Sequence, residues 1–475
     1  MVVEALAGHT IHQASITGVS RTEPAAFDKY AGSEKSLRFT KLLIVSNLCS
    51  KAFKLFIRYA EVWCNKTPYI CLEITYTLVM ILKEVKDKAR AREFLDLARK
   101  IYEGDPYWVC PLDNMVEGVF DPARNVFFTH GEAIRWVLYD DQGNSIGRVA
   151  AFINRKKAFN FEQPTGGMGF FECINDREAA YCLFDASKAW LADKGMEAMD
   201  GPINFGENEN FWGLLVEGYM HPSFGMNYHH KYYIDFFESY GFKPYFEQVT
   251  NHLDLTKPFP ERFWKIADWV RQRPGYEFKH FTWKNSRQFI EDFKNIYDDA
   301  WQFHENFTPI ETKVLLKSLE EIKPIMVEEF IWFAYHESEP IAFLVMVPDA
   351  NEMLKRFHGK MGLIDKLRFW YLSKMNIFTR SRITVMGIKP KYQKSGIESA
   401  IFWHLDKVMK KRPNYKEIEL SWVGDFNPKM RQLHESVGGY FAKRHITYRY
   451  LFSQASDFRR SVIIPLDTKE KTVKS

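Results

Sequence analysis

The sequence predicts a mixed α/β fold (α+β, with a mixed sheet) in which two domains of similar design follow each other. In both halves, short apolar runs typical of strands alternate with amphipathic helical segments. In addition, Phe237-Glu-Ser-Tyr-Gly241 corresponds to His434-Glu-Ser-Val-Gly438, and 434 − 237 gives an offset of 197 residues. Each motif closes a short predicted helix ahead of an aromatic-rich strand. This repeat favours two related domains over one domain with an unrelated partner.

Composition is that of a globular protein and excludes several functions. The 475 residues, 46% of them hydrophobic, suffice for two or three domains of about 100 to 200 residues. The net charge of +5 is small, and no basic run with interleaved aromatics predicts a nucleic-acid partner. The six cysteines form no Cys-x-x-Cys pair, so neither a metal site nor a disulfide framework is indicated.

We expect neither a secretory signal nor a membrane-spanning segment. Its start lacks the ordered basic, apolar and small-residue regions of a signal peptide. The apolar stretch Tyr69–Leu82 is interrupted by Glu73 and is shorter than the roughly 20 residues that a spanning helix needs. We therefore expect a cytoplasmic protein.

Changes in composition predict the domain limits. The first part holds three of the six cysteines and no settled apolar period. The character changes at Met80, which would also serve as an initiator, so we expect a domain to begin there. We predict an N-terminal extension of doubtful structure at 1–79, a first domain at 80–255, a connector at 256–275, a second domain at 276–455 and a C-terminal tail at 456–475.

Periodicity predicts the elements of both halves in order. The first half is expected to form strands at 80–85, 133–139, 146–154, 167–174 and 198–203, with helices at 87–102, 176–194 and 232–240. The second half is expected to form strands at 276–283, 328–335, 341–347, 383–388 and 417–422, with helices at 286–301, 309–325, 397–411 and 427–438.

The most informative segment runs from Ile383 to Gly438. An apolar strand leads through Gln393-Lys-Ser-Gly396 into a helix, and a second strand leads to a helix opened by Asn427-Pro. A glycine-bearing turn before a helix directs N–H groups and the positive end of the helix dipole at one point, which suits a phosphate group. Glu398 places a carboxylate beside that point, where it would oppose an anion unless it turns outward or meets Lys394.

This pattern, Gln-x-x-Gly after a strand and then Asn before a helix ending in Glu-x-x-Gly, resembles the GNAT acyltransferases over Tyr276–Phe452. The resemblance implies acyl-CoA or acetyl-CoA as co-substrate and no permanently bound cofactor. Only the second domain is expected to bind it, because the corresponding turn of the first domain, Glu172-Cys-Ile-Asn-Asp-Arg177, is acidic and lacks Gln-x-x-Gly. The CoA-binding residues it implies are Met386, Gly387, Ile388, Gln393, Lys394, Ser395, Gly396, Ile397, Asn427 and Met430.

Transfer to an amine needs a base near the thioester and a proton source for the leaving thiolate. Many relatives place a tyrosine as this acid where the chain has His434, and the imidazole can donate such a proton. The strand at 383–388 contains no acid that would serve as the base. Glu419, Asp425, and Glu172 or Glu209 reaching from the first domain are the alternatives, and a structural role stays open for each.

The first domain contains a long loop, 204–230, that is rich in glycine, amide, carboxylate and imidazole groups. Such a loop can position an acceptor substrate, although surface loops have the same composition. We predict substrate contacts from Asn204, Glu207, Asn208, Glu209 and Asn227. Together with Gly201-Pro-x-Asn204 and Gly213-Leu-Leu-Val-Glu-Gly218, the chain resembles a bacterial family of tandem GNAT proteins over Met80–Phe452, to which bacterial ceramide synthases are related.

The segment 350–382 is strongly basic. It holds eight lysines and arginines against two acids, and 8 − 2 gives a net charge of +6. Leu363, Leu367, Trp370, Tyr371, Met375 and Phe378 are spaced to form one helical face. A basic amphipathic helix with aromatics predicts peripheral contact with an anionic membrane at its inner face, and packing on its own domain is the alternative.

These observations predict an acyl-CoA-dependent N-acyltransferase whose acceptor is an amine. The basic aromatic segment and the family resemblance favour a lipid amine such as a sphingoid base. Acetylation of a small polar amine is an alternative. A non-catalytic binding or scaffold protein is another, because Glu398 and His434 depart from the family pattern.

Overall fold

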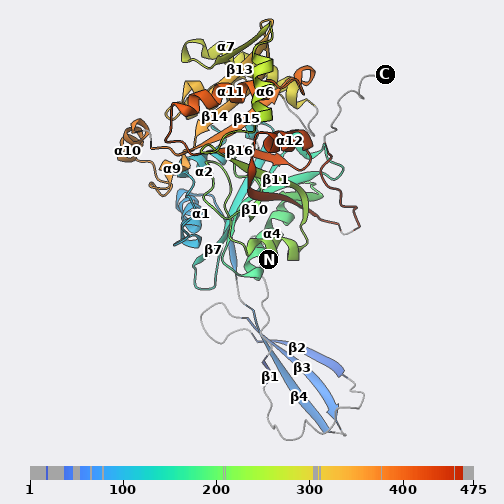
Figure 1. Cartoon of the computed structure of the whole chain (residues 1–475). Coiled ribbons are helices and arrows are strands. Elements are labelled where there is room, and N and C mark those ends of the chain that lie inside the picture. Colours follow the sequence, from blue (N-terminus) through green and yellow to red (C-terminus); the bar gives the residue numbers. More distant parts are fainter. Residues whose placement is uncertain are drawn as a thin grey trace. The chain divides into compact units, whose positions relative to one another are not determined.

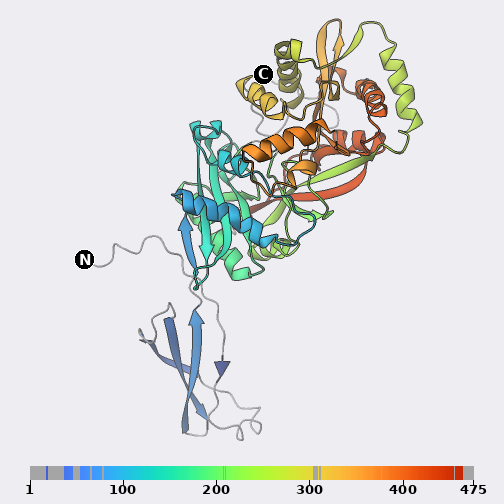
Figure 2. The same ribbon diagram turned by 90° about the vertical axis from the view of Figure 1, so that its left-hand side faces the viewer.

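The structure is a computed structural model, shown from two sides in Figures 1 and 2. It describes strands at 18–19, 37–45, 54–64 and 67–77, and residues 80–463 apart from 207, 209, 303–308, 310–311, 376 and 454. The chain divides into two compact units. Unit 1 consists of residues 1–101, 134–150 and 171–190, and unit 2 of residues 102–133, 151–170 and 191–475.

The backbone of the N-terminal segment forms a four-stranded antiparallel sheet in the order β1-β4-β3-β2. Its strands are β1 (Gly18–Val19), β2 (Leu37–Val45), β3 (Lys54–Cys64) and β4 (Thr67–Thr77). It stays a prediction that residues 1–79 are an extension separate from the first domain.

Unit 1 also contains strand β5 (Ile81–Glu84), which pairs antiparallel with β6 (Gly131–Tyr139). Strands β7 (Ser145–Asn154) and β8 (Thr165–Cys173) contribute residues to this unit as well, together with helices α1 (Lys88–Ile101) and α4 (Arg177–Asp193). Helix α4 packs closely on β7, because a Cβ atom at Gly147 would come within 2.8 Å of the Leu183 side chain. Phe94 of α1 is fully buried.

Unit 2 is organised around a mixed sheet with the strand order β12-β13-β14-β15-β16-β11-β17-β9. Neighbours in this order are antiparallel, except β15 and β16, which are parallel. Strand β10 (Leu214–Glu217) pairs with β17. The other strands are β12 (Tyr276–His280), β13 (Ile331–His336), β14 (Glu339–Pro348), β15 (Arg380–Ile388), β16 (Glu417–Gly424), β11 (Lys243–Asp254), β17 (Tyr440–Leu451) and β9 (Ala198–Gly201). The predicted α/β class with a mixed sheet is confirmed.

The two sequence halves exchange their last strands. Strand β11 ends the first half of the sequence, yet it lies between β16 and β17 of the second half. Strand β17 ends the second half and pairs with β9 of the first. Because of this exchange, unit 2 contains strands from both halves, and the domain limits drawn from the sequence stay a prediction.

Helices cover both faces of the sheet of unit 2. Neighbouring residues of β13 point to opposite faces, so Trp332 packs in the core with α11 and α6 while Phe333 packs with α7. Helix α6 forms within the segment expected as a connector. The helices are α2 (Asp113–Val119), α3 (Arg155–Ala158), α5 (Tyr233–Tyr240), α6 (Glu261–Arg271), α7 (Ser286–Trp301), α8 (Thr312–Ile322), α9 (Asn351–Leu354), α10 (Leu363–Lys374), α11 (Ile397–Lys410) and α12 (Pro428–Ser436), with 3-10 turns at Val126–Thr129, Trp283–Asn285, Glu328–Phe330 and Pro390–Tyr392.

Candidate functional site

Strands β15 and β16 pair over only part of their length. The parallel register runs from Arg380 opposite Glu417 to Ile383 opposite Leu420 and then ends. Strand β15 continues to Ile388 beside β14, and β16 continues beside β11. The two strands therefore stop sharing backbone hydrogen bonds in the middle of the sheet.

This separation leaves backbone groups of β15 directed away from β14. The N–H of Lys389 donates to Ile341 O at 2.9 Å, on the β14 side. In an antiparallel pair, alternate residues direct both backbone groups to the same neighbour, so Met386 and Ile388 face the opposite side. Consistently, Ile388 O accepts from Gln393 Nε2 at 3.3 Å. The N–H and C=O of Met386 thus face the side that β16 has left.

The turn that follows β15 forms a cluster of N–H groups. Within the described residues, no hydrogen bond is recorded for the N–H groups of Ser395, Gly396 and Ile397, which precede or open α11. Lys394 and Gly396 have φ angles of 66° and 79°, and consecutive N–H groups in such a turn form an anion-binding nest. Gly396 is also closely packed, because a Cβ atom there would lie 2.4 Å from Ile266 Cγ2 of α6.

Glu398 lies in the first turn of α11, beside this nest. Burial raises the pKa of its carboxyl group, and its own backbone N–H opposes that shift only in part. Its Oε2 atom is buried and has no hydrogen-bond partner among the described residues. The raised pKa favours the neutral carboxylic acid, which reduces the repulsion that a carboxylate would exert on a bound anion.

The second arm of the predicted CoA site meets the first. The Asn427 side chain accepts from the N–H of Met430 at 3.3 Å and so caps α12. In the same first turn, Lys429 Nζ donates to Gln393 Oε1 at 3.3 Å. The structure therefore brings the start of α12 beside the turn that precedes α11.

Glu419 lies in a buried charge network. The side chain is fully buried, and its carboxylate oxygens lie 2.6 Å from Lys443 Nζ, 3.2 Å from His252 Nε2 and 3.4 Å from Arg382 Nε. Burial opposes ionisation, but the neighbouring Lys443 and the His252 hydrogen bond hold the pKa of this carboxyl well below its usual value. Both carboxylate oxygens already lie against basic side chains, which argues against a role as general base.

Two other predicted catalytic residues, Asp425 and Glu172, each lie close to an arginine side chain. Asp425 accepts from the N–H of Glu247 and forms an ion pair with Arg460. Glu172 lies in unit 1, with Oε1 3.5 Å from Arg148 Nη2.

His434 is buried on α12, 3.4 Å from Asn251 Nδ2 through its Nδ1 atom. Burial lowers the pKa of His434 to about 4, so the imidazole is neutral near pH 7. A neutral imidazole has no imidazolium proton to give to a thiolate.

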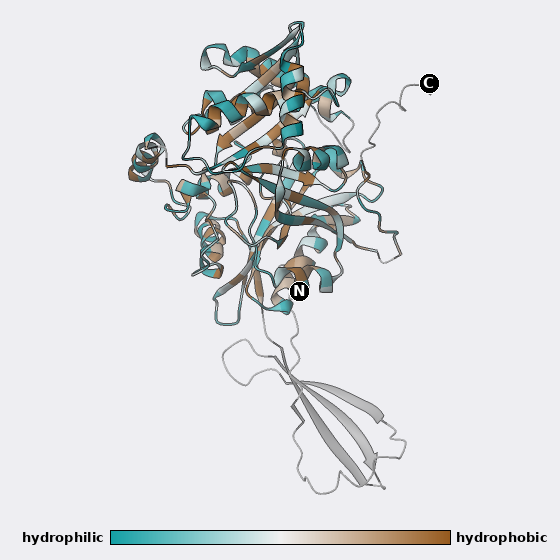
Figure 3. Cartoon of the chain, in the orientation of Figure 1, coloured by the Kyte–Doolittle hydropathy of each residue, from teal (hydrophilic) through white to brown (hydrophobic). Residues whose placement is uncertain are grey.

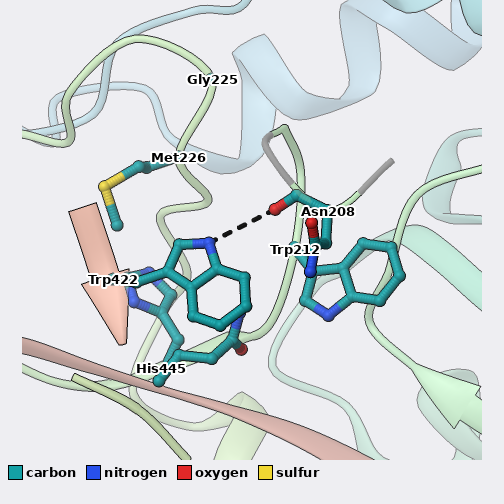
Figure 4. A pocket seen from close by; sticks show the side chains of 7 residues that line it. Asn208, Trp212, Gly225, Met226, Trp422 and His445 are labelled. Carbon is teal, nitrogen blue, oxygen red and sulfur yellow. Dashed lines mark hydrogen bonds between the residues drawn. The ribbon is translucent and has the colours of Figure 1, made fainter. Parts of the chain in front are cut away.

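A small pocket in unit 2 lies beside the point where β15 and β16 separate. Its interior volume is about 10 Å³, roughly the room that one water molecule needs. Trp422 of β16, two residues after Leu420, lines it, and the indole N–H donates to Asn208 O at 3.3 Å. Figure 4 shows this bond together with the other lining side chains. The full lining set is Asn208, Trp212, Gly225, Met226, Gln248, Trp422 and His445.

Two lining side chains each have a buried polar atom without a hydrogen-bond partner among the described residues, Gln248 Nε2 and His445 Nδ1. The Gln248 amide is oriented by a chain of bonds. Trp212 Nε1 donates to Thr447 Oγ1 at 3.1 Å, and Thr447 donates to Gln248 Oε1 at 3.2 Å. The amide oxygen is therefore occupied, and the amide nitrogen remains as a donor.

His445 is fixed in one tautomer by its other neighbour. Its Nε2 atom lies 3.0 Å from the backbone oxygen of Asn227, which can only accept. Nε2 therefore carries the proton, and Nδ1 presents a lone pair. Burial lowers the pKa of His445 to about 4, so this neutral form prevails near pH 7. The open lone pair can take a proton from a bound amine once the amine has attacked a carbonyl and become acidic, because a pKa of about 4 makes the resting imidazole a weak base.

The loop 204–230 contributes to this pocket only in part. Asn208 lines it, and the backbone oxygen of Asn227 holds His445. Asn204 is buried with its Oδ1 atom unpartnered within the described residues, but it does not line the pocket. Glu207 and Glu209 lie outside the described residues.

Neither Gln248 nor His445 was among the site residues predicted from the sequence. The sequence signal that could have found His445 is the alternation of polar residues at Lys443, His445 and Thr447 along one strand. All three side chains are about 1% exposed, so this polar face of the strand is buried. Burial of that face follows from the strand exchange, which sequence periodicity does not reveal.

A second cavity of about 140 Å³ lies in unit 2 near Arg380. Two of its charged side chains already have partners. Arg380 forms an ion pair with Asp349, and Glu352 accepts from Thr379 and from the N–H of Arg380. In the part of the chain that the structure describes, no cluster of histidine, cysteine or acidic residues could hold a metal ion, and no helix is long and apolar enough to cross a membrane.

The mixed sheet, the separated parallel strands, the nest before α11 and the Asn427 cap are the features that the resemblance to tandem GNAT proteins led us to expect. No family model matches the chain. The chain is 28% identical over 379 residues to the bacterial ceramide synthase of Caulobacter vibrioides. This alignment covers 77% of the chain and 95% of that protein. It is 25% identical over 393 residues to protein YghO of Escherichia coli, and this alignment covers 80% of the chain and 98% of that protein.

Among solved structures, a tandem GNAT protein from the clavulanic acid biosynthesis pathway is similar with a TM-score of 0.47 and 10% identity, over 80% of this chain and 100% of that one. The chain is thus related over most of its length to the Caulobacter and Escherichia proteins.

Proposed function

We propose that the protein is an acyl-CoA-dependent N-acyltransferase. One observation carries this proposal: strand β16 separates from β15 after Leu420 and, two residues later, lines a pocket that His445 also lines, with its Nδ1 atom buried and unpartnered among the described residues. Strand β16 therefore adjoins both the backbone groups of β15, which can hold a thioester, and the pocket of His445, which can serve an amine as base. An acyl transfer requires this juxtaposition.

The donor would bind along β15 and the turn. The N–H groups of Ser395, Gly396 and Ile397 would receive the diphosphate, supported by the positive end of α11. The backbone of Met386 and Ile388 would hold the pantetheine arm. Gly387, Gln393, Lys394, Asn427 and Met430 complete the set that the family resemblance implies.

His445 would act as the general base. The amine nitrogen attacks the thioester carbonyl carbon, the C–S bond breaks, and the amine proton passes to His445 Nδ1. The CoA thiolate leaves with the electron pair and takes up one proton, so the products are an amide and CoA-SH. Gln248 also lines the pocket, and its Nε2 donor, which has no partner among the described residues, would orient an oxygen of the acceptor.

For the acceptor we favour a lipid amine such as a sphingoid base. The support is the similarity over 95% of a relative named bacterial ceramide synthase. Its 28% identity does not carry the acceptor over, so a small polar amine with acetyl-CoA is retained as the alternative.

The test uses the purified full chain with acyl-CoA donors from acetyl to palmitoyl and two acceptor pools, sphingoid bases and small polar amines. Amide formation is followed by mass spectrometry, and CoA binding is measured separately by calorimetry. We expect amide from a long-chain donor and a sphingoid base. Amide from acetyl-CoA with a polar amine would replace the acceptor, and CoA binding without any transfer would favour a non-catalytic protein.

A further inference from the structure

The basic segment 350–382 contains two helices that pack differently. Helix α9 is anchored, because Met353 and Leu354 are buried in the core of unit 2 and Phe357 follows them there. Helix α10 has no buried residue along its whole length. In Figure 1 it lies at the margin of unit 2. Phe378, which the sequence analysis placed on the apolar face of this helix, is instead buried in the core after the helix has ended.

Helix α10 exposes a continuous apolar face. At 100° per residue its exposed apolar side chains fall on one side of the helix. Figure 3 shows that hydrophobic and hydrophilic residues are mixed along this helix. Leu363 and Ile364 are 81% and 82% exposed, and Trp370 is 60% exposed. The face, which we call the α10 face, consists of Leu363, Ile364, Leu367, Trp370, Tyr371 and Met375. The opposite side, with Phe369 and Leu372, packs on the core.

Positive charges border the α10 face. Lys366 and Arg368 flank it on either side by the same helical geometry, and Lys360 and Lys374 lie near its two ends. No ion pair to another described residue is recorded for these four side chains. The one acid of the helix, Asp365, is engaged as a cap, since its Oδ2 accepts from the N–H of Gly362 at 3.0 Å.

We infer that the α10 face docks on an anionic lipid bilayer. An apolar face of this size, with aromatics and bordered by cations that form no ion pair with another described residue, matches the interfacial helices that insert side chains at the headgroup boundary. The charge decides the occupant, because the lysines and arginine complement anionic headgroups and would repel a second copy of the same face. This inference is independent of the proposed acyl transfer.

The test measures flotation of the full chain with phosphatidylcholine vesicles that contain or lack phosphatidylglycerol. We expect binding to the anionic vesicles that weakens at about 1 M salt, where the Debye length is about 3 Å. The double variant Leu367→Glu/Trp370→Glu should bind at least about tenfold more weakly. Trp269→Glu is the matched control, because Trp269 is 58% exposed on α6 and its replacement should leave vesicle binding unchanged.

The charge border is tested separately. Lys366→Ser combined with Arg368→Ser should weaken binding to anionic vesicles. Lys284→Ser, an exposed lysine in the 3-10 turn before α7, should leave that binding unchanged. Circular dichroism and melting temperature establish that each variant is folded. Absence of vesicle binding by the wild type, equal binding to both vesicle types, or undiminished binding by the double variant would each overturn the inference. So would loss of a dimer, rather than of vesicle binding, in Leu367→Glu/Trp370→Glu.

Discussion

His445 Nε2 lies 3.0 Å from the backbone oxygen of Asn227, and this contact decides which nitrogen of the ring is basic. Asn227 is itself held in position, because its side-chain Nδ2 donates to Gly213 O at 2.9 Å. The loop that holds Asn227 can approach this closely because Gly213, at φ +80°, has no side chain. A Cβ atom there would lie 2.3 Å from Gln248 Oε1. The loop thus orients both polar groups of the pocket.

The first prediction concerns His445→Gln. Glutamine keeps a side-chain donor for Asn227 O but cannot accept a proton as imidazole does, so we expect kcat to fall about 100-fold or more while CoA affinity is kept. Because the pKa of His445 is lowered to about 4, wild-type kcat/KM should rise with pH through about 4, and this step should vanish in the variant. His404→Gln is the control, since its pKa is also about 4 but it stacks on Trp332 away from the pocket. Equal losses in both variants would mean a structural effect.

Gly396→Ala should weaken CoA binding. The left-handed conformation at φ +79° costs an alanine about 1–2 kcal/mol, and its Cβ would press on Ile266 of α6. The turn must shift, so we expect the Kd for CoA, measured by calorimetry, to rise at least about tenfold. Gly195→Ala is the matched control, because Gly195 has φ +81° with nothing within 4 Å of the added Cβ. A CoA affinity that changes equally in both variants would contradict the proposed nest.

Glu398→Gln should alter how CoA binding depends on pH. Burial raises the pKa of Glu398, so the carboxyl is neutral at low pH and becomes charged as the pH rises. A charged carboxylate would repel a diphosphate, so wild-type affinity should fall with rising pH more steeply than that of the variant. The phosphates of CoA ionise in the same way in both experiments, so the difference between the two pH profiles reports the Glu398 carboxyl alone. Glu435→Gln, an exposed change on α12, should behave like the wild type. Identical pH profiles for Glu398→Gln and the wild type would place the carboxyl away from the ligand.

Local sequence signals predicted the elements well. The strand at 383–388, the turn at Gly396 and the Asn427 cap are set by neighbouring residues, and the structure forms each of them in place as β15, the α11 N-terminus and the α12 cap. The strand exchange was not predictable in this way. Strand β11 has the same local pattern whether it pairs within its own half or with β16, because pairing partners are chosen by tertiary packing.

The consequence for the site was large. Glu419 looked like an open acid on a strand, but β11 and β17 supply His252 and Lys443 as its partners. Conversely, His445 belongs to the aromatic-rich strand that follows Gly438, and no role was predicted for it from the sequence. Pairing with β11 buries it beside Gln248, its neighbour in register across the two strands. Residues that obtain their chemistry from a partner strand far away in the sequence are not visible to a local pattern.

Glu419→Gln should destabilise the protein without changing the pH step assigned to His445. Removing one partner of a buried charge network leaves the other charges uncompensated, and such changes cost about 3–5 kcal/mol. Chemical denaturation at neutral pH measures this loss, and Glu320→Gln is the control, since its ion pair with Lys323 is exposed and should change stability by less than about 1 kcal/mol.

The pH dependence of the same variant gives a second check. The pKa of Glu419 is depressed in the folded state, so its contribution is present above the unfolded pKa of about 4.3 and is lost as the pH falls through the folded value. The difference in unfolding free energy between wild type and Glu419→Gln should therefore be constant at neutral pH and shrink in acid. A fully stable Glu419→Gln protein with at least about 100-fold lower kcat would instead return Glu419 to the role of general base.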